Sequence, residues 1–154
     1  MLIGASTPVE GAIQVSSAGG VMNTAVKQES LGKILIVDDA QDIRDSLNQI
    51  LSGAGYEVVQ AEDGQNAFEA ASSEEFDLII TDINMPGMNG IELLSSLRKL
   101  ENRNRDTPAF VLTTESLRRF ASTCEELGAN VWIVKPVNGD KLIKYVGRFM
   151  RRDC

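Results

Sequence analysis

The residues of this chain that could do chemistry are acidic and polar side chains placed directly after apolar runs. Asp38 and Asp39 follow the run at residues 33–37, and Asp82 follows the run at residues 77–81. Two like charges about 4 Å apart repel each other by about 4 kcal/mol at an effective dielectric constant near 20. Carboxylates held this close either acquire raised pKa values or bind a cation. Hard oxygen ligands open to water suit Mg²⁺.

A hydroxyl and an ammonium group follow two further apolar runs. Thr113 ends the run at residues 108–113, and Lys135 follows the run at residues 131–134. A cation, an ammonium group and a hydroxyl around one carboxylate would stabilise the charge on a phosphoryl group that transfers to that carboxylate. Asp82 is central in this set, so we predict that it is the nucleophile and becomes an aspartyl phosphate.

These side chains meet only if the apolar runs are strands of one sheet. Apolar runs alternate along the chain with stretches of helical period. The expected strands are residues 33–37, 56–61, 77–81, 108–113 and 131–134. The expected helices cover residues 43–51, 64–73, 89–100, 117–127 and 139–150. Right-handed crossovers then give a mainly parallel sheet with helices on both faces.

We therefore predict the α/β class, as a doubly wound, flavodoxin-like (βα)5 fold with five parallel strands in the order 2-1-3-4-5. Ligands of such sheets bind beyond the carboxyl ends of the strands, where the winding direction reverses. In this order the reversal lies between the first and third strands. Asp38, Asp39 and Asp82 are thus expected to converge.

Composition excludes several classes of function. The net charge of −7 argues against general affinity for nucleic acid or an anionic membrane. The chain contains 0 histidines, which excludes an imidazole base, a histidine metal ligand and a phosphohistidine of its own. We find no membrane-spanning run and no secretory signal. Cys124 and Cys154 suggest no disulfide framework, so a cytoplasmic location is expected.

The chain length of 154 residues suits one domain. Residues 1–31 show no sustained period and are predicted to be a flexible N-terminal tail. Residues 32–154 are predicted to form the single domain, and we expect a monomer.

Four motifs carry a resemblance to a known family. ILIVDDA, DLIITDINMPGMNG, VLTTES and WIVKP, in this order, resemble the receiver domain of two-component response regulators. The match covers about residues 34–150, and the last two motifs look most like chemotaxis regulators of the CheY type. The resemblance implies that Asp39, Asp82 and the backbone carbonyl of Asn84 ligate Mg²⁺ directly. It implies that Asp38 acts mainly through a metal-bound water.

The same resemblance assigns the phosphoryl chemistry. Asp82 would accept phosphate from a phosphohistidine of a sensor histidine kinase, with Lys135 pairing with the phosphoryl group and Thr113 moving toward it. Trp132 stands where the family usually has a rotating Tyr or Phe. Thr114 stands where the family often has Ala, and is expected to slow self-dephosphorylation. The residues expected to modulate the site are Asn84, Thr114 and Glu115.

The resemblance places the output surface at residues 116–127 and 131–150. This half of the chain is richer in basic residues than the rest, which suits an acidic partner segment or simply a solvated face. They are Arg118, Arg119, Lys141, Lys144, Arg148, Arg151 and Arg152. A stand-alone regulator would signal by binding a partner, plausibly a flagellar motor switch protein or a phosphatase. A phosphate sink or a relay intermediate is the alternative within this class.

Other interpretations remain open at this point. Asp38 or Asp39 could cap the following helix, Lys135 could be a solvated loop residue, and Trp132 could be a packing aromatic. A small phosphohydrolase with an aspartyl nucleophile would need a D-x-D motif after the first strand. Flavin binding would need a glycine- and hydroxyl-rich loop where DDAQD stands.

Overall fold

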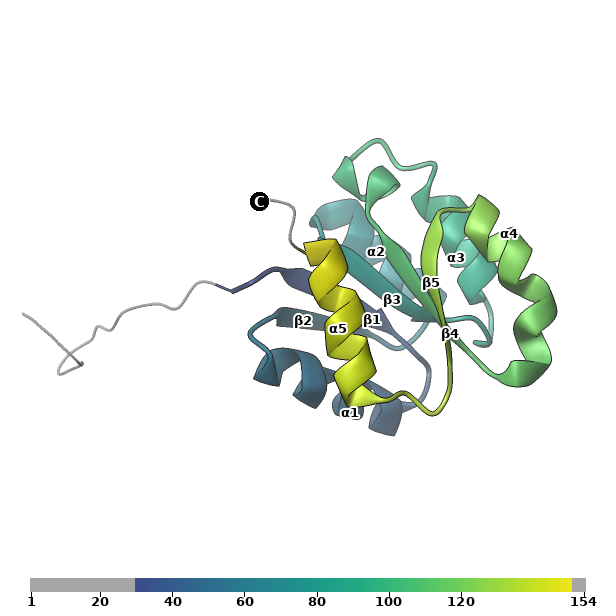
Figure 1. The fold of residues 1–154 in the computed structure, drawn as a ribbon. Helices are drawn as coiled ribbons and strands as arrows, with labels where there is room; N and C mark the ends of the chain where they lie inside the picture. The colour runs from purple at the N-terminus through teal and green to yellow at the C-terminus, as the bar shows by residue number, and fades with distance from the viewer. Residues whose placement is uncertain (1–29, 151–154) are drawn as a thin grey trace, which may run out of the picture.

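Five parallel strands form one sheet in the order β2-β1-β3-β4-β5 (Figure 1). The computed structural model describes residues 30–150, apart from the side chains of residues 115 and 117. The strands are β1 (Lys33–Val37), β2 (Glu57–Ala61), β3 (Leu78–Asp82), β4 (Ala109–Thr113) and β5 (Ala129–Val134). The predicted class and strand order are confirmed. Most of the predicted tail, as well as Arg151, Arg152 and Cys154, lies outside the described residues.

Helices cover both faces of this sheet (Figure 1). They are α1 (Gln41–Gly53), α2 (Gly64–Ser73), α3 (Gly90–Leu97), α4 (Ala121–Glu126) and α5 (Gly139–Met150). Two 3-10 helices, η1 (Arg103–Asp106) and η2 (Glu115–Phe120), precede β4 and α4. In the part of the chain that the structure covers, no helix combines the length and the apolar character that crossing a membrane requires.

The central strands are apolar on both sides because each side is covered by helices. Successive side chains of a strand point to opposite faces, so Ile34 and Ile36 of β1 pack with α1 and α5, whereas Leu35 and Val37 pack with α2 and α3. Each fully buried side chain of this kind contributes about 1.5–3 kcal/mol. The result is a rigid frame whose strand ends are fixed relative to one another.

The fourth helix differs from its expected extent. The stripe beginning at Leu117 predicts one continuous helix, but residues 115–120 form η2 and α4 begins only at Ala121. The backbone N–H of Ala121 donates to Arg118 O, which is the tighter 3-10 pattern. Apolar spacing does not distinguish these two helix types over so few residues.

Candidate functional site

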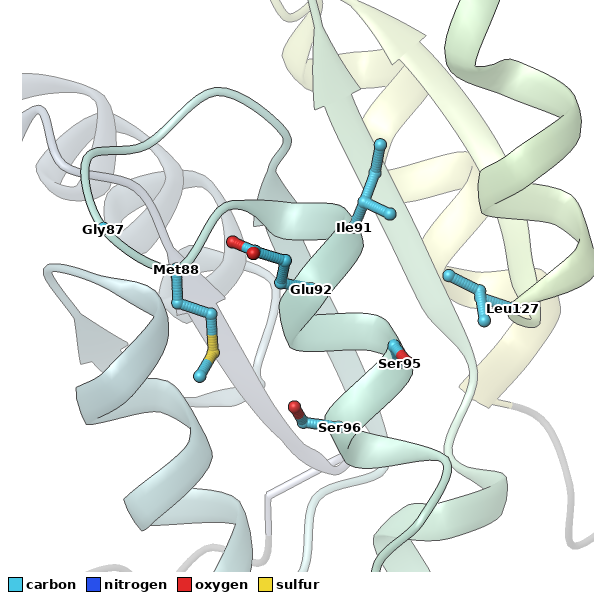
Figure 2. A pocket seen from close by; sticks show the side chains of 7 residues that line it. All are labelled: Gly87, Met88, Ile91, Glu92, Ser95, Ser96 and Leu127. Carbon is cyan, nitrogen blue, oxygen red and sulfur yellow. The ribbon is translucent and has the colours of Figure 1, made fainter.

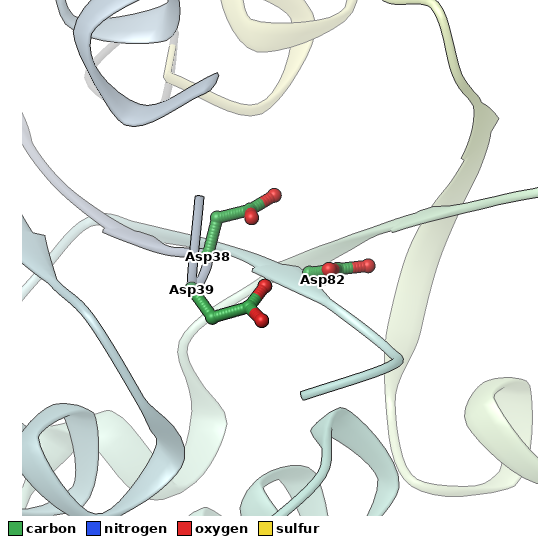
Figure 3. A group of neighbouring side chains, drawn as sticks. All are labelled: Asp38, Asp39 and Asp82. Atoms are coloured by element: carbon green, nitrogen blue, oxygen red, sulfur yellow. The ribbon is translucent and has the colours of Figure 1, made fainter. Parts of the chain in front are cut away.

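Three carboxylates meet beyond the carboxyl ends of β1 and β3, as predicted. Val37 pairs with Thr81 in the sheet, so the residues that follow them, Asp38 and Asp82, lie beside each other. One carboxylate oxygen from each of Asp38, Asp39 and Asp82 lies within 4.8 Å of the others. Figure 3 shows the three side chains projecting toward the same side. Asp38 and Asp82 are buried, whereas Asp39 is exposed.

Asp38 is held at its amide and at both carboxylate oxygens. Its backbone N–H donates to Ala61 O at 3.2 Å. Its Oδ1 accepts the Ala40 N–H at 2.9 Å, and its Oδ2 accepts from Lys135 Nζ at 3.0 Å. Neither Asp38 nor Asp39 is the N-cap of α1, because that position is taken by Ala40.

Lys135 brings a cation to two of the carboxylates. Its Nζ lies 3.0 Å from Asp38 Oδ2 and 3.4 Å from Asp82 Oδ2. Its backbone N–H donates to Thr113 O at 2.7 Å, which fixes the loop after β5 against the end of β4. Burial alone would lower the pKa of Lys135, but the hydrogen bond to Asp38 and the charges of Asp82 and Asp38 outweigh it and raise the pKa. Lys135 is therefore an ammonium ion in this site, not a solvated loop lysine.

Of the two buried carboxylates, Asp82 has the weaker side-chain contacts. Its side chain accepts the Asn84 N–H at 3.4 Å and contacts Lys135 at 3.4 Å. Burial and the negative charge of Asp38 raise the pKa of Asp82, and Lys135 opposes this only in part. The buried pair thus carries more negative charge than the lysine neutralises.

The donor set suits a hard divalent cation. Asp39 offers an exposed carboxylate with no side-chain hydrogen bond among the described residues, next to the two buried ones. Oxygen ligands in an acidic site at the protein surface are the environment in which Mg²⁺ binds with retained waters. Asp38, Asp39 and Asp82 are therefore the residues that could hold such an ion.

Thr113 reaches the same edge of the sheet, and among the described residues its hydroxyl forms no hydrogen bond with the carboxylates. It is buried at the end of β4, and its Oγ1 donates to Thr114 O at 3.2 Å. Thr114 is exposed, and its hydroxyl lies 2.9 Å from that of Ser116. Asn84 is exposed directly after Ile83, and the side chain of Glu115 is not described.

Trp132 lies in β5 and packs among apolar side chains. It pairs with Val111 in the sheet and packs on the cluster that includes Leu94 and Cys124. Its Nε1 is buried and has no hydrogen-bond partner in the described part of the chain. The indole is half-buried here, which agrees with a packing aromatic in this state.

Two residues of the site were not foreseen from sequence. Arg44 of α1 donates from Nη1 to Asp38 O at 2.6 Å, and nothing in its spacing marks it apart from its place in the first turn after the aspartates. Gly90 is the second, because a Cβ atom there would collide with the carbonyl oxygen of Asp82. Glycine is needed for this close backbone approach.

A groove of about 640 Å³ runs along α3 but contains none of the predicted site residues. Figure 2 shows its lining side chains on both sides of α3 and at the end of α4. They are Gly87, Met88, Ile91, Glu92, Ser95, Ser96 and Leu127.

Comparison with known proteins identifies the family. A family model for the response regulator receiver domain matches residues 34–147. The chemotaxis protein CheY of Pseudomonas aeruginosa is 34% identical over 121 residues, which are 78% of this chain and 97% of that protein. A crystal structure of the chemotaxis protein CheY4 of Vibrio cholerae has a TM-score of 0.71 and 39% identity, and the match covers 76% of this chain and 97% of that one.

Two further similarities come from sensory proteins. The sensory/regulatory protein RpfC of Xanthomonas campestris is 33% identical over 72% of this chain, which spans only 15% of that longer protein. The receiver domain of a sensor histidine kinase from Pseudomonas aeruginosa, solved with a magnesium ion coordinated in its active site cleft, has a TM-score of 0.71 at 27% identity. That match covers 77% of this chain and 97% of the other. By its fold, its acidic cluster and these similarities, the chain belongs to the response regulator receiver domain family and is CheY-like.

Proposed function

We propose that this chain is a response regulator of a two-component phosphorelay whose Asp82 accepts a phosphoryl group from a sensor histidine kinase. The observation that carries the proposal is the position of Lys135 Nζ, 3.0 Å from Asp38 and 3.4 Å from Asp82, beside three convergent carboxylates. Asp38 already uses both side-chain oxygens for contacts with Ala40 and Lys135. Of the two buried carboxylates Asp82 has the longer contacts, so its oxygen is freer to attack than those of Asp38.

The transfer exchanges one bond to phosphorus for another. An Asp82 carboxylate oxygen forms the new O–P bond while the N–P bond of the donor phosphohistidine breaks, and the leaving imidazole takes up a proton. Lys135 then pairs with a phosphoryl oxygen. The Thr113 hydroxyl donates to Thr114 O in the present state and would turn to donate to a second phosphoryl oxygen.

Mg²⁺ is the proposed cofactor; Asp39, Asp82 and the backbone carbonyl of Asn84 would hold it directly, and Asp38 would act mainly through a metal-bound water. When bound it supplies positive charge that offsets the carboxylates and the phosphoryl oxygens. Support comes from the cluster of donor oxygens within 4.8 Å and from the magnesium ion in the related receiver domain. Asp39 contributes the exposed donor, and the buried Asp38 keeps Lys135 in place.

The proposed output is phosphorylation-dependent binding of a partner by the surface of α4, β5 and α5, in chemotaxis control. Lys141, Lys144 and Arg148 are exposed at spacings of three and four residues along α5, and none forms an ion pair within the described residues. A groove of about 220 Å³ beside them is lined in part by Trp132 and Tyr145. Acidic segments of a flagellar motor switch protein would suit this charge. Similarity to chemotaxis proteins supports that role, and return of phosphate to a histidine domain is the alternative.

Intact mass spectrometry with a small phosphodonor tests the acceptor function. The protein is incubated with acetyl phosphate, with Mg²⁺ or with EDTA. We expect one added phosphoryl group in Mg²⁺ and none in EDTA, and no adduct in Asp82→Asn. An adduct of equal yield in Asp82→Asn would overturn the proposal.

A further inference from the structure

Arg44 links helix α1 to the backbone of the acidic site. Its Nη1 donates to Asp38 O at 2.6 Å, and its Nε donates to Gln60 Oε1 of β2 at 3.3 Å. Its own backbone N–H donates to Ala40 O at 3.1 Å in the first turn of the helix. The guanidinium therefore ties the turn between β1 and α1 to the neighbouring strand.

The contact with Arg44 fixes the backbone carbonyl of Asp38, which is the one polar group of that residue that its other contacts do not hold. The amide and both carboxylate oxygens of Asp38 are held as described above, and its carbonyl is held by Arg44. That carbonyl belongs to the peptide unit joining Asp38 to Asp39. Asp39 makes no side-chain hydrogen bond among the described residues, so this peptide unit is what sets the direction in which its side chain leaves the backbone.

We propose that Arg44 is a positioning residue for the cation site: by holding the Asp38 carbonyl it directs the Asp39 carboxylate toward Asp82. The inference rests on the proposed function, because it concerns the site in which Mg²⁺ binds. A partner that orients a metal ligand typically changes metal affinity by about 10–100-fold when it is removed. The role is indirect, since Arg44 contacts backbone and not a ligand oxygen.

Removal of Arg44 should change the Mg²⁺ affinity in opposite directions, depending on whether the charge of Arg44 or its contact with Asp38 matters more. A guanidinium beside a cation site repels the cation, so loss of its charge by itself would strengthen Mg²⁺ binding. Loss of the hold on Asp38 would weaken binding. The direction of the change in affinity therefore separates a positioning residue from a nearby solvated cation.

The test is calorimetric titration of Mg²⁺ into the full chain, repeated with Mn²⁺ by counting free ion in paramagnetic resonance spectra. We expect Arg44→Met to bind Mg²⁺ about 10-fold more weakly than wild type. Arg44→Lys, which keeps one donor and the charge, should fall between the two.

Arg103→Met is the matched control. Arg103 is also an arginine with two side-chain partners, Asp77 at 2.7 Å and Glu75 at 3.5 Å, but Asp77 precedes β3 at the opposite end of the sheet. Its loss removes an arginine charge and two side-chain contacts far from the acidic site and should leave the Mg²⁺ affinity within about twofold of wild type, which separates a general effect of losing an arginine from positioning.

Two outcomes would overturn the inference in distinguishable ways. Unchanged or tighter Mg²⁺ binding by Arg44→Met, with normal binding by wild type, would remove the positioning role and leave the proposed function intact. Absence of Mg²⁺ binding by wild type would remove the metal site itself and the inference with it.

Discussion

Lys135 and Asp38 form an ion pair of 3.0 Å between the ends of β5 and β1, two strands that β3 and β4 separate in the sheet. The side chain of Asp38 is fully buried, whereas that of Lys135 is 23% exposed. A buried carboxylate without a partner costs several kcal/mol. This contact therefore both stabilises the fold and holds an ammonium group against Asp82.

Removal of the lysine should destabilise the metal-free protein. We expect Lys135→Met to lower the free energy of unfolding by about 2 kcal/mol, less than for a fully buried pair because Lys135 is partly exposed. Urea unfolding in EDTA measures the change. Lys141→Met is the control, because Lys141 is exposed and has no ion pair among the described residues. Equal stability of the Lys135 and Lys141 variants would refute the structural role.

The raised pKa of Asp82 predicts a pH dependence with a definite sign. A carboxyl whose folded pKa lies above its ordinary value of 3.8 binds its proton more tightly in the folded state. This tighter proton binding stabilises the folded protein fully below pH 3.8, and the stabilisation is lost as the pH rises through the folded pKa. At neutral pH without metal, Asp82→Asn should therefore unfold at higher urea concentration than wild type.

Two comparisons isolate the effect of this one carboxyl. The advantage of Asp82→Asn should shrink as the pH falls through the folded pKa of Asp82 and should be lost below 3.8, because wild type is then protonated as well. Saturating Mg²⁺ should raise the stability of wild type more than that of the variant. A neutral-pH midpoint for Asp82→Asn at or below that of wild type would contradict the raised pKa.

Thr114 is predicted to slow loss of the phosphoryl group. It is exposed beside Thr113, and its hydroxyl lies 2.9 Å from that of Ser116, which restrains it near the strand ends. We expect Thr114→Ala to dephosphorylate faster than wild type once excess phosphodonor is removed. Ser116→Ala, which removes the hydroxyl partner and keeps the bulk of Thr114, should lie nearer wild type. Identical decay in wild type and Thr114→Ala would exclude the effect.

Trp132 offers an optical measurement of switching. Its buried Nε1 has no acceptor in the described part of the chain, and an unsatisfied buried donor is costly to leave in place. We expect beryllofluoride with Mg²⁺ to change the tryptophan emission as the ring moves. The change should be lost in Asp82→Asn. Emission that stays constant while beryllofluoride binds would leave Trp132 as a packing residue.

The parts predicted from sequence are those encoded by local pattern. A continuous apolar run such as residues 33–37 predicts a buried strand, and the strand order then brings Asp38 and Asp82 together. The missed parts depend on contacts between distant segments. Asn104 is buried, and its amide donates to Ala71 O of α2 and to Glu74 O just after that helix, so its partners lie about thirty residues earlier in the chain and no local pattern marks it. Arg44 is similar, since any exposed helix can carry an arginine.

The central claim is that Asp82, not Asp38 or Asp39, carries the phosphoryl group. Borohydride reduces an aspartyl phosphate to homoserine, and trypsin separates the candidates because residues 34–44 and 45–98 each end at an arginine without an internal cleavage site. After acetyl phosphate and Mg²⁺, fragmentation spectra should place homoserine at position 82 in the 45–98 peptide. Homoserine in the 34–44 peptide, or at neither place, would contradict the account.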